Sequence, residues 1–325
     1  MNRRAAFTLV ELLVVAGIFA MLFGMVLNGA RPTATGQVKQ AAQSIASVLL
    51  ATQSKALGKP AGAGVIFDPA GGGAAVATVS AADMLPLITG SCTNGMPPTN
   101  LADTTASVTI APDNADAADL AHGYKIRFHE EEPAAQAPTA WMEFKSSASS
   151  VVSFRTGNGQ TTQNTIWPKP ANGGPLKVTI ARYPNEGETL YELPKAAAID
   201  LRYSGIGDGT SFSTNWSNLS GKGALAVAFD SVGEVDAVMQ QVLSAATART
   251  VQPLAPTQPI YLLVAARADV EAGANTLASS TSLWVVIHPQ TGRVSVSSNV
   301  PQAATDATAL RNARANARAG LAIGK

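Results

Sequence analysis

Few residues of this 325-residue chain could do chemistry, and the most conspicuous is a carboxylate inside an apolar run. Glu11 is the only charged residue in the stretch Phe7–Leu27. A carboxylate at the centre of a membrane-spanning segment costs about 3 kcal/mol on insertion scales, so its presence indicates a function and a partner. The run itself has about the length that a helix needs to cross a hydrocarbon core. The sequence therefore predicts a membrane-spanning segment that carries a functional acid.

The other candidates for catalysis or metal binding are sparse. The single cysteine, Cys92, can form neither an intrachain disulfide nor a cysteine-based zinc site. His122 and His129 precede three glutamates but lack a zinc-motif spacing, and Asp113–Asp119 does not have the spacing of a calcium loop. No phosphate-binding loop or hydrolase string occurs in the sequence. We therefore expect no metal, no cofactor and no enzymatic activity.

Composition narrows the class of protein further. Hydrophobic residues make up 46% of the chain, which is enough for a sizeable core and argues against disorder over the whole length. Only 14% of the residues are charged, and 23 basic against 22 acidic side chains exclude a globally basic nucleic-acid binder. A low-charge chain whose polar surface comes from Ser, Thr, Asn and Gln is typical of the cell envelope.

The residues Ala6-Phe7-Thr8-Leu9-Val10-Glu11 resemble the N-terminal signal of type IV pilins and type II secretion pseudopilins. In that family a prepilin peptidase cuts before the apolar run, and the new first residue is N-methylated. The resemblance implies cleavage between Ala6 and Phe7, N-methylation of Phe7, and an assembly role for Glu11 at the fifth mature position. This sequence has Ala6 where the family usually has glycine. The alternatives are a secretory signal peptide, for which Asn28-Gly29-Ala30 is a poor cleavage site, and a plain membrane anchor.

Under that resemblance, Glu11 is expected to pair with the N-terminal amine of a neighbouring subunit. Either charge alone would be buried and unpaired inside an apolar bundle, whereas together they form an ion pair that specifies register. The alternative partner of Glu11 is the assembly platform in the inner membrane.

Beyond the apolar run, a helical period continues to Leu57. Apolar or small residues recur at steps of three and four and predict one buried face: Val38, Ala41, Ile45, Val48, Leu49, Thr52 and Ala56. Gly58 and Pro60 are expected to end this helix. After Pro60, short alternating runs bounded by turn residues predict β-strands, among them Val151–Arg155 and Leu283–Ile287 but none between Val79 and Ser107. A short helix is expected around Ala81–Leu87.

These patterns predict an α+β fold of the pilin type. A long N-terminal helix, membrane-spanning in its first half, would pack on an antiparallel β-sheet or β-sandwich head. The expected division is a leader (1–6), a transmembrane helix (7–30), an amphipathic half (31–58), a β-rich periplasmic head with insertions (59–300) and a basic Ala-rich tail (301–325).

A narrower resemblance is to H-type minor pseudopilins and the related FimT-type minor pilins. The string AAQSIASVLLATQSKALGKPAGAGVIFD (residues 41–68) looks like that family's junction of helix and first strand. Three later segments resemble its closing strands: 193–205, 224–238 and 282–297. Nothing familiar occurs between Asp68 and Leu193. We interpret this portion as an elaboration of the head, in a single enlarged domain, with a separate domain as the alternative.

The resemblance implies a minor pseudopilin-like subunit of a type II secretion or type IV pilus-like machine. Its expected location is the inner membrane, crossed once, with the C-terminal head in the periplasm. Its expected partners are the prepilin peptidase, other pseudopilins or pilins, the assembly platform and membrane lipid. The alternatives are a FimT-like minor pilin that binds DNA or surfaces, and a membrane-anchored enzyme of unknown activity.

DNA or phosphate contact would involve arginines near the C-terminus. A helix would align Arg311, Arg314 and Arg318 on one face, and Arg293 follows Gly292 in a predicted turn. The composition of residues 302–325 favours a different interpretation, a basic disordered tail with no binding site.

Overall fold

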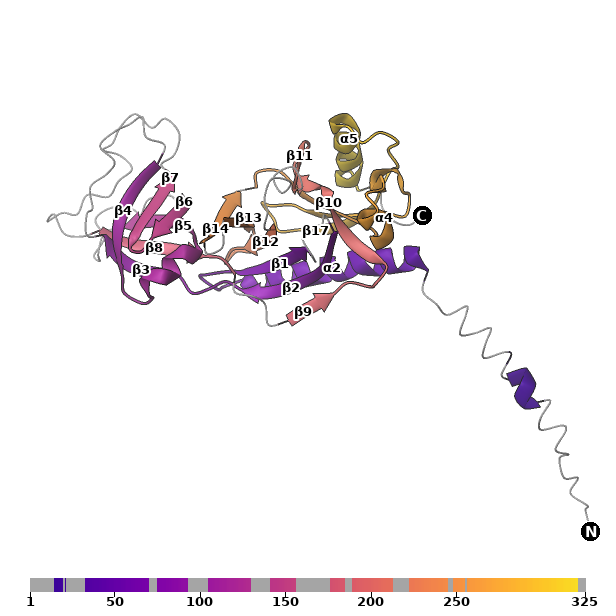
Figure 1. Ribbon diagram of the computed structural model, residues 1–325, viewed down its shortest axis with the longest axis horizontal. Coiled ribbons are helices and arrows are strands. Elements are labelled where there is room, and N and C mark those ends of the chain that lie inside the picture. The colour runs from indigo at the N-terminus through magenta and orange to yellow at the C-terminus, as the bar shows by residue number, and fades with distance from the viewer. Residues whose placement is uncertain are drawn as a thin grey trace, which may run out of the picture.

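The computed structural model describes eleven stretches of the chain: residues 15–19, 21, 33–69, 75–92, 105–129, 141–155, 176–184, 189–212, 222–244, 248–254 and 256–320. These stretches form a large sheet with one long helix on it, a small barrel beside the sheet and a short C-terminal helix (Figure 1).

Helix α2 (Ala34–Ala56) is the longest helix among the described residues. The side chain of Thr33 caps its start by accepting a hydrogen bond from the N–H of Gly36 (3.2 Å). The helix ends at Ala56, and Gly58 follows with a φ of +76°, a conformation that favours glycine. The predicted stripe is confirmed by the buried residues of α2, listed here in order: Val38, Ala41, Ala42, Ile45, Leu49, Thr52 and Ala56.

Within the described residues, eleven strands form one antiparallel sheet. They are β1 (Ala63–Pro69), β2 (Ala75–Asp83), β9 (Thr189–Glu192), β10 (Ala197–Ile206), β11 (Thr210–Ser211), β12 (Lys222–Phe229), β13 (Val235–Ser244), β14 (Ala248–Leu254), β15 (Ile260–Ala266), β16 (Leu283–Ile287) and β17 (Val294–Ser298). The order across the sheet is β14-β13-β12-β1-β2-β10-β15-β16-β17, with β9 beside β2 and β11 beside β10.

The main core lies between α2 and one face of this sheet. Alternate residues of the central strands point toward the helix, as in Val65 of β1 paired with Val227 of β12. On β15 and β16, Leu262 and Val285 are likewise paired and buried in the same cluster. Because successive side chains of a strand point to opposite faces of the sheet, one face of the sheet can be apolar and bury the apolar stripe of α2.

The opposite face is covered at one end by helices near the C-terminus. Helix α5 (Ala307–Arg318) begins at Asp306, whose carboxylate accepts from the N–H of Ala309 (2.7 Å). Leu310, Ala313 and Ala317 of α5 pack against Tyr261 and the fully buried Trp284, which belong to β15 and β16. The short helix α4 (Arg267–Glu271) and the 3-10 turn η4 (Thr276–Ala278) complete this layer.

The C-terminal end of α2 is tied to two hairpin turns of the sheet. The Nε2 of Gln53 donates to the carbonyl oxygens of Gly233 (2.8 Å) and Thr291 (3.1 Å), in the β12–β13 and β16–β17 turns. Gly292 has a φ of +61°, and a Cβ there would lie 2.1 Å from the oxygen of Gly233. The turns and the helix end therefore meet with no room for a larger residue at Gly292.

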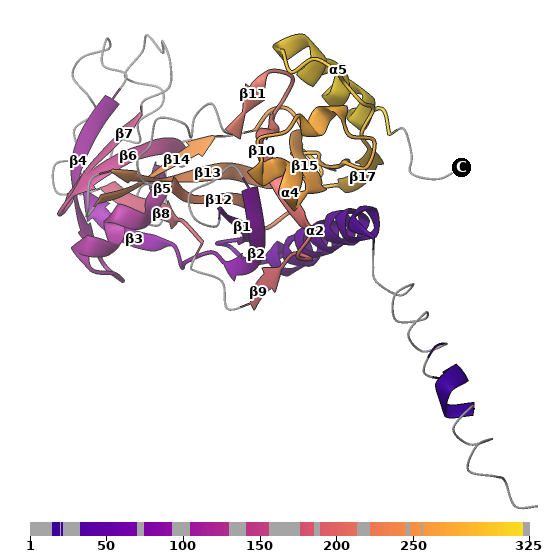
Figure 2. The ribbon, with the colours of Figure 1, turned by 45° about the vertical axis from the view of Figure 1, so that its right-hand side comes forward.

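The segment between β2 and β9 folds as a closed six-stranded barrel (Figure 2). Its strands, in the order around the barrel, are β3 (Ile88–Cys92), β4 (Thr105–Pro112), β7 (Val151–Arg155), β6 (Met142–Ala148), β5 (Gly123–His129) and β8 (Leu176–Arg182). The 3-10 turn η2 (Ala117–His122) precedes β5. Phe128 and Phe154 meet inside at 5.2 Å between ring centroids, and burial beside them raises the pKa of the Cys92 thiol to about 12.

The barrel is attached to the face of the sheet opposite α2. The chain enters and leaves through a narrow neck, where Met84 and Pro184 form a β-bridge. An apolar cluster joins Tyr124 of the barrel to Ala226 and Met239 of the sheet. Beside it, the hydroxyl of Tyr124 donates to Oδ2 of Asp236 (2.7 Å), and Nζ of Lys125 donates to Oδ1 of the same carboxylate.

The predicted fold class is wrong. The described chain is mostly β and contains two separate β units, an open eleven-stranded sheet and a closed barrel, in place of one β-sheet or β-sandwich head. Its one long helix begins only at Ala34, so the expected long helix with a membrane-spanning first half is not what the described residues form. Within the stretches described, no helix combines the length and the apolar character needed to cross a membrane.

Two local expectations are also wrong. The helix expected around Ala81–Leu87 is replaced by the end of β2, because Ala81 and Ala82 pair with Val65 and Gly64 of β1. Tertiary pairing here outweighs the helix propensity of alanine. The disordered tail expected over residues 302–325 is replaced between Ala307 and Arg318 by α5, because Leu310, Ala313 and Ala317 supply an apolar face that the sheet buries.

Candidate functional site

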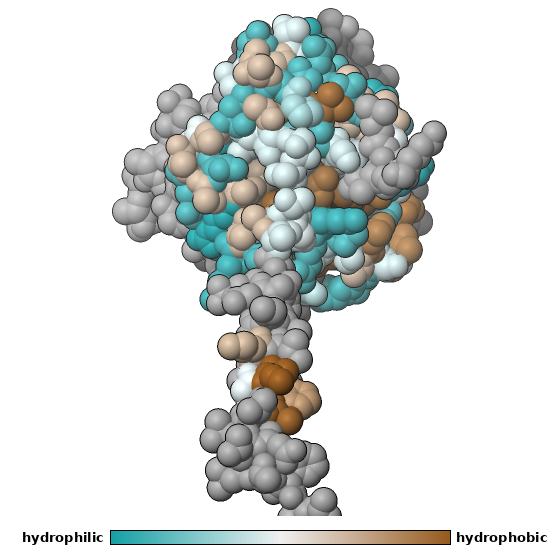
Figure 3. Space-filling model, turned by 90° about the vertical axis from the view of Figure 1, so that its right-hand side faces the viewer, coloured by the Kyte–Doolittle hydropathy of each residue, from teal (hydrophilic) through white to brown (hydrophobic). Residues whose placement is uncertain are grey.

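The N-terminal residues with the clearest expected roles, Ala6, Phe7 and Glu11, lie outside the described residues. The part of the apolar run that is described, residues 15–19 and 21, is helical and stands apart from the folded body (Figures 1 and 3). Its large side chains are exposed: Val15 44%, Ile18 54%, Phe19 58% and Met21 75%. Burying each such side chain is worth about 1.5–3 kcal/mol, so this segment has a strong tendency to enter an apolar surrounding.

The C-terminal arginines do not form the single stripe that helical spacing predicts. Arg311 and Arg318 are exposed on α5, and Arg293 is exposed in the β16–β17 turn. Arg314 is instead fully buried between α5 and the sheet. Because α5 rests on the sheet through the face that carries Arg314, this residue is not available for an external phosphate.

Arg314 holds α5 in place. Its Nη1 donates to the carbonyl oxygen of Gly207 (2.6 Å) and its Nη2 to that of Tyr203 (2.7 Å), both in the β10–β11 region. The guanidinium also lies over the ring of Tyr261, 5.4 Å from its centroid. Burial lowers the pKa of Arg314 to about 10, and the nearby Tyr261 and Asp208 partly oppose that shift.

Two of the exposed arginines act electrostatically on a histidine. Burial lowers the pKa of His288 below its ordinary value, and the positive charges of Arg293 and Arg318 lower it further. Arg293 belongs to the β16–β17 turn and Arg318 to the end of α5, so charges from two elements act on one imidazole. With Arg314 buried, the arginines left for an external phosphate are Arg293, Arg311 and Arg318.

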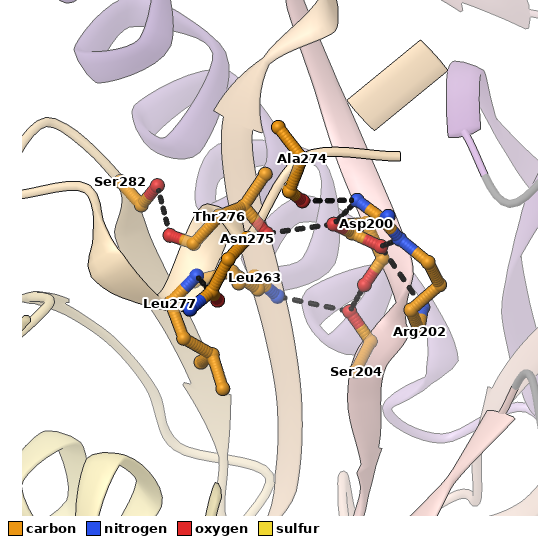
Figure 4. A network of polar contacts seen from close by, with 9 residues as sticks. All are labelled: Asp200, Arg202, Ser204, Leu263, Ala274, Asn275, Thr276, Leu277 and Ser282. Atoms are coloured by element: carbon orange, nitrogen blue, oxygen red, sulfur yellow. Dashed lines mark hydrogen bonds and ion pairs between the residues drawn. The ribbon is translucent and has the colours of Figure 1, made fainter. Parts of the chain in front are cut away.

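Asp200 of β10 is a fully buried carboxylate that no sequence motif singles out (Figure 4). Its Oδ1 accepts from the backbone N–H (3.0 Å) and Nε (2.9 Å) of Arg202. Its Oδ2 accepts from Nη2 of Arg202 (2.6 Å) and Oγ1 of Thr276 (2.7 Å). These four hydrogen bonds use the acceptor capacity of the carboxylate, which therefore has no free position for a substrate proton.

The same network lies where the pairing of two strands of the sheet is irregular. The pairing of β10 with β15 shifts register between Asp200 and Gly205. Ser204 bridges the gap, because its hydroxyl donates to the carbonyl oxygen of Asp200 (2.6 Å) and accepts from the N–H of Leu263 (2.9 Å). We therefore assign this cluster a structural role.

The acidic loop considered for calcium serves local structure instead. Oδ2 of Asp119 accepts from the N–H of Asp116 (3.1 Å), and Asp119 lies 3.5 Å from Arg182. The Asn114 side chain bonds the backbone of Leu87 and Thr89. Across the described stretches, no group of three or more His, Cys, Asp or Glu side chains could hold a metal ion.

Comparison with known proteins adds one finding. Residues 1–27 match the family described as the prokaryotic N-terminal methylation motif. This match supports a type IV pilin-like protein with a membrane-anchored N-terminus, a substrate of prepilin peptidase that assembles with other pilins. No curated protein and no solved structure gives a significant match to the chain.

Proposed function

We propose that this protein is a minor pseudopilin-like structural subunit of a type II secretion or type IV pilus-like machine. The observation that carries the proposal is the match of residues 1–27 to the methylation motif. The resemblance to the pilin signal puts Phe7 and Glu11 at the first and fifth mature positions. The exposed apolar side chains of Val15, Ile18, Phe19 and Met21 support it, since a segment of this kind requires a membrane or a bundle of like segments.

The proposal extends to the H-type subclass. The segments 224–238 and 282–297, which resemble that subclass, form the hairpins β12–β13 and β16–β17, and Gln53 of α2 bonds both of their turns. The barrel between β2 and β9 accounts for the unfamiliar middle of the chain. We propose that the head acts in the periplasm by contact and not by catalysis, and that the N-terminal segment crosses the inner membrane once and meets the assembly platform and lipid there.

A FimT-like role in binding DNA is the second candidate. It is favoured by the exposure of Arg293, Arg311 and Arg318, and by the positive charges of Arg293 and Arg318 that lower the pKa of His288. Such binding would weaken steeply with salt, because phosphate contacts release counterions. Double replacement of Arg293 and Arg318 by alanine should abolish it if these residues form the site.

Processing provides the first test. We expect mature protein extracted from membranes to begin at an N-methylated Phe7, because the basic residues Arg3 and Arg4 keep the preceding peptide in the cytoplasm, where the peptidase acts. Intact-mass analysis measures this directly. A chain that begins at Arg31 would identify a secreted protein and would end the proposal.

Assembly provides the second test. Glu11→Gln removes the charge at nearly constant volume, so insertion and cleavage should persist. Cross-linking of the mature protein to other pilins in cells should fall at least about tenfold, because a buried amine loses its counter-ion. Glu234→Gln, an equal charge change in the exposed β12–β13 turn, is the matched control. Equal cross-linking of wild type and Glu11→Gln at equal protein levels would show that the charge has no role in assembly.

A further inference from the structure

The two edges of the eleven-stranded sheet differ in how they are covered. At one edge, β14 contacts β5, β6 and η2 of the barrel. At the other edge, β17 pairs with β16 and, in the part of the chain that the structure describes, with no further strand. The helices α2 and α5 contact β17 from its two faces and leave its outer side without a strand.

Hydrogen bonds at both ends of β17 determine which backbone groups face outward. His288 donates its N–H to the oxygen of Arg293 (2.9 Å), and Asn299 donates its N–H to the oxygen of Ser282 (3.1 Å). Hydrogen-bonded residues alternate along an antiparallel pair. Ser295 and Ser297 therefore bond β16, whereas Val294, Val296 and Ser298 direct three N–H donors and three C=O acceptors away from the sheet.

This edge lacks the usual protection against pairing. Exposed edge strands are normally blunted by charged side chains, proline or a bulge, and the sequence VSVSS of β17 contains no charge and no proline. Its pairing with β16 is continuous over five residues. Val294 and Val296 pack with the core under α2, while Ser297 is buried on the other face. An added strand would therefore place aliphatic residues on the α2 side and small polar residues opposite.

A second copy of the chain does not suit this edge. Antiparallel pairing of β17 with itself generates a two-fold axis perpendicular to the sheet. That axis reverses every direction in the plane of the sheet, including the direction of α2, so the two N-terminal segments would leave in opposite directions. Anchoring in one membrane requires both to leave the same way, and this step of the argument rests on the proposed function.

We propose that the β17 edge is a docking site for an extended, uncharged segment of a different protein subunit, with alternating aliphatic and small polar residues. The segment adds a strand to the sheet by bonding the outward backbone groups of Val294, Val296 and Ser298. Main-chain bonds supply the affinity, and the alternation of side chains supplies the register.

Proline at position 298 tests the proposal with little effect on the fold. Ser298→Pro removes an outward N–H and obstructs the edge, but it takes no hydrogen bond from the β16–β17 ladder. Ser298→Ala keeps the N–H and is the matched control. The probe is a labelled synthetic peptide of alternating valine and serine with lysines at both ends, added to the full-length mature protein in detergent. We expect binding within about twofold of wild type for Ser298→Ala and at least about tenfold weaker for Ser298→Pro.

Further outcomes separate the possible occupants. The same peptide N-methylated at alternate residues should not bind, and equal binding of the methylated peptide would overturn the proposal, as would no binding of the parent peptide. A photo-cross-linking residue at position 298 should capture a different pilin-like subunit in cells. Capture of a second copy alone, or a wild-type dimer that Ser298→Pro dissociates, would overturn the choice of partner. The peptide assay reads the head alone and the Glu11→Gln assay reads the N-terminal segment, so either proposal can fail without the other.

Discussion

Asp200→Ala is expected to lower the free energy of unfolding by about 3–5 kcal/mol, the usual effect of removing one member of a buried ion pair. The substitution leaves the guanidinium of Arg202 without its bidentate partner and the hydroxyl of Thr276 without its acceptor. It also removes the group that accepts the N–H of Arg202, where the register between β10 and β15 shifts. The damage therefore falls at the centre of the sheet.

The measurement is chemical denaturation of the full-length protein in detergent, followed by circular dichroism in the β region. Asp208→Ala is the control, because Asp208 lies close by in the sequence but its side chain is exposed. Asp200→Asn should lose less stability than Asp200→Ala, since an amide oxygen still accepts part of the network. A loss below about 1 kcal/mol for Asp200→Ala would contradict the role assigned to this cluster.

Arg314→Ala is expected to cost about 3–4 kcal/mol, with the damage concentrated at α5. The change leaves two buried carbonyl oxygens, those of Gly207 and Tyr203, without their charged donor, and it opens a cavity beside Tyr261. Because α5 rests on one end of the sheet and is the last element described, we expect it to detach before the sheet unfolds.

Limited trypsin digestion reports this detachment through the rate of cleavage after Arg311. That rate should rise at least about tenfold in Arg314→Ala, because a helix docked on the sheet must open before a protease can cut it. Arg318→Ala is the control, since Arg318 belongs to the same helix but is exposed. If both variants resist trypsin as well as wild type does, Arg314 does not anchor α5.

Local sequence patterns predicted the elements better than their arrangement. The apolar period of α2 and the alternation in the strands depend only on residues that are close in the sequence, so the sequence alone predicts them. The expected strands Val151–Arg155 and Leu283–Ile287 coincide with β7 and β16. By contrast, β3 was missed, because Ile88–Cys92 is short and partly polar and is held in place by pairing with β4 and the distant β8.

The architecture and the buried polar groups depended on contacts that spacing does not encode. The closure of the barrel joins β3 to β8 across more than 80 residues, as in Cys92 paired with Leu176. Arg314 has the same helical spacing as its exposed neighbours, and only the position of the sheet decides that it is buried. Asp200 lies two residues before an arginine in the same strand, a common pattern on exposed surfaces, and the packing of η4 over it completes the network through Thr276.

The narrow neck of the barrel has a consequence for the evolution of this chain. Met84 and Pro184 are paired in a β-bridge, so the two ends of the inserted segment between them, which we call the cassette, lie next to each other. The cassette has an apolar core of its own. Its gain or loss in a single recombination event would leave the eleven-stranded order of the sheet intact and would disturb the contacts around Tyr124 and those that β5, β6 and η2 make with β14. Relatives of this chain are therefore expected to differ in length mainly at this point, with the barrel present in some lineages and a tight turn in others.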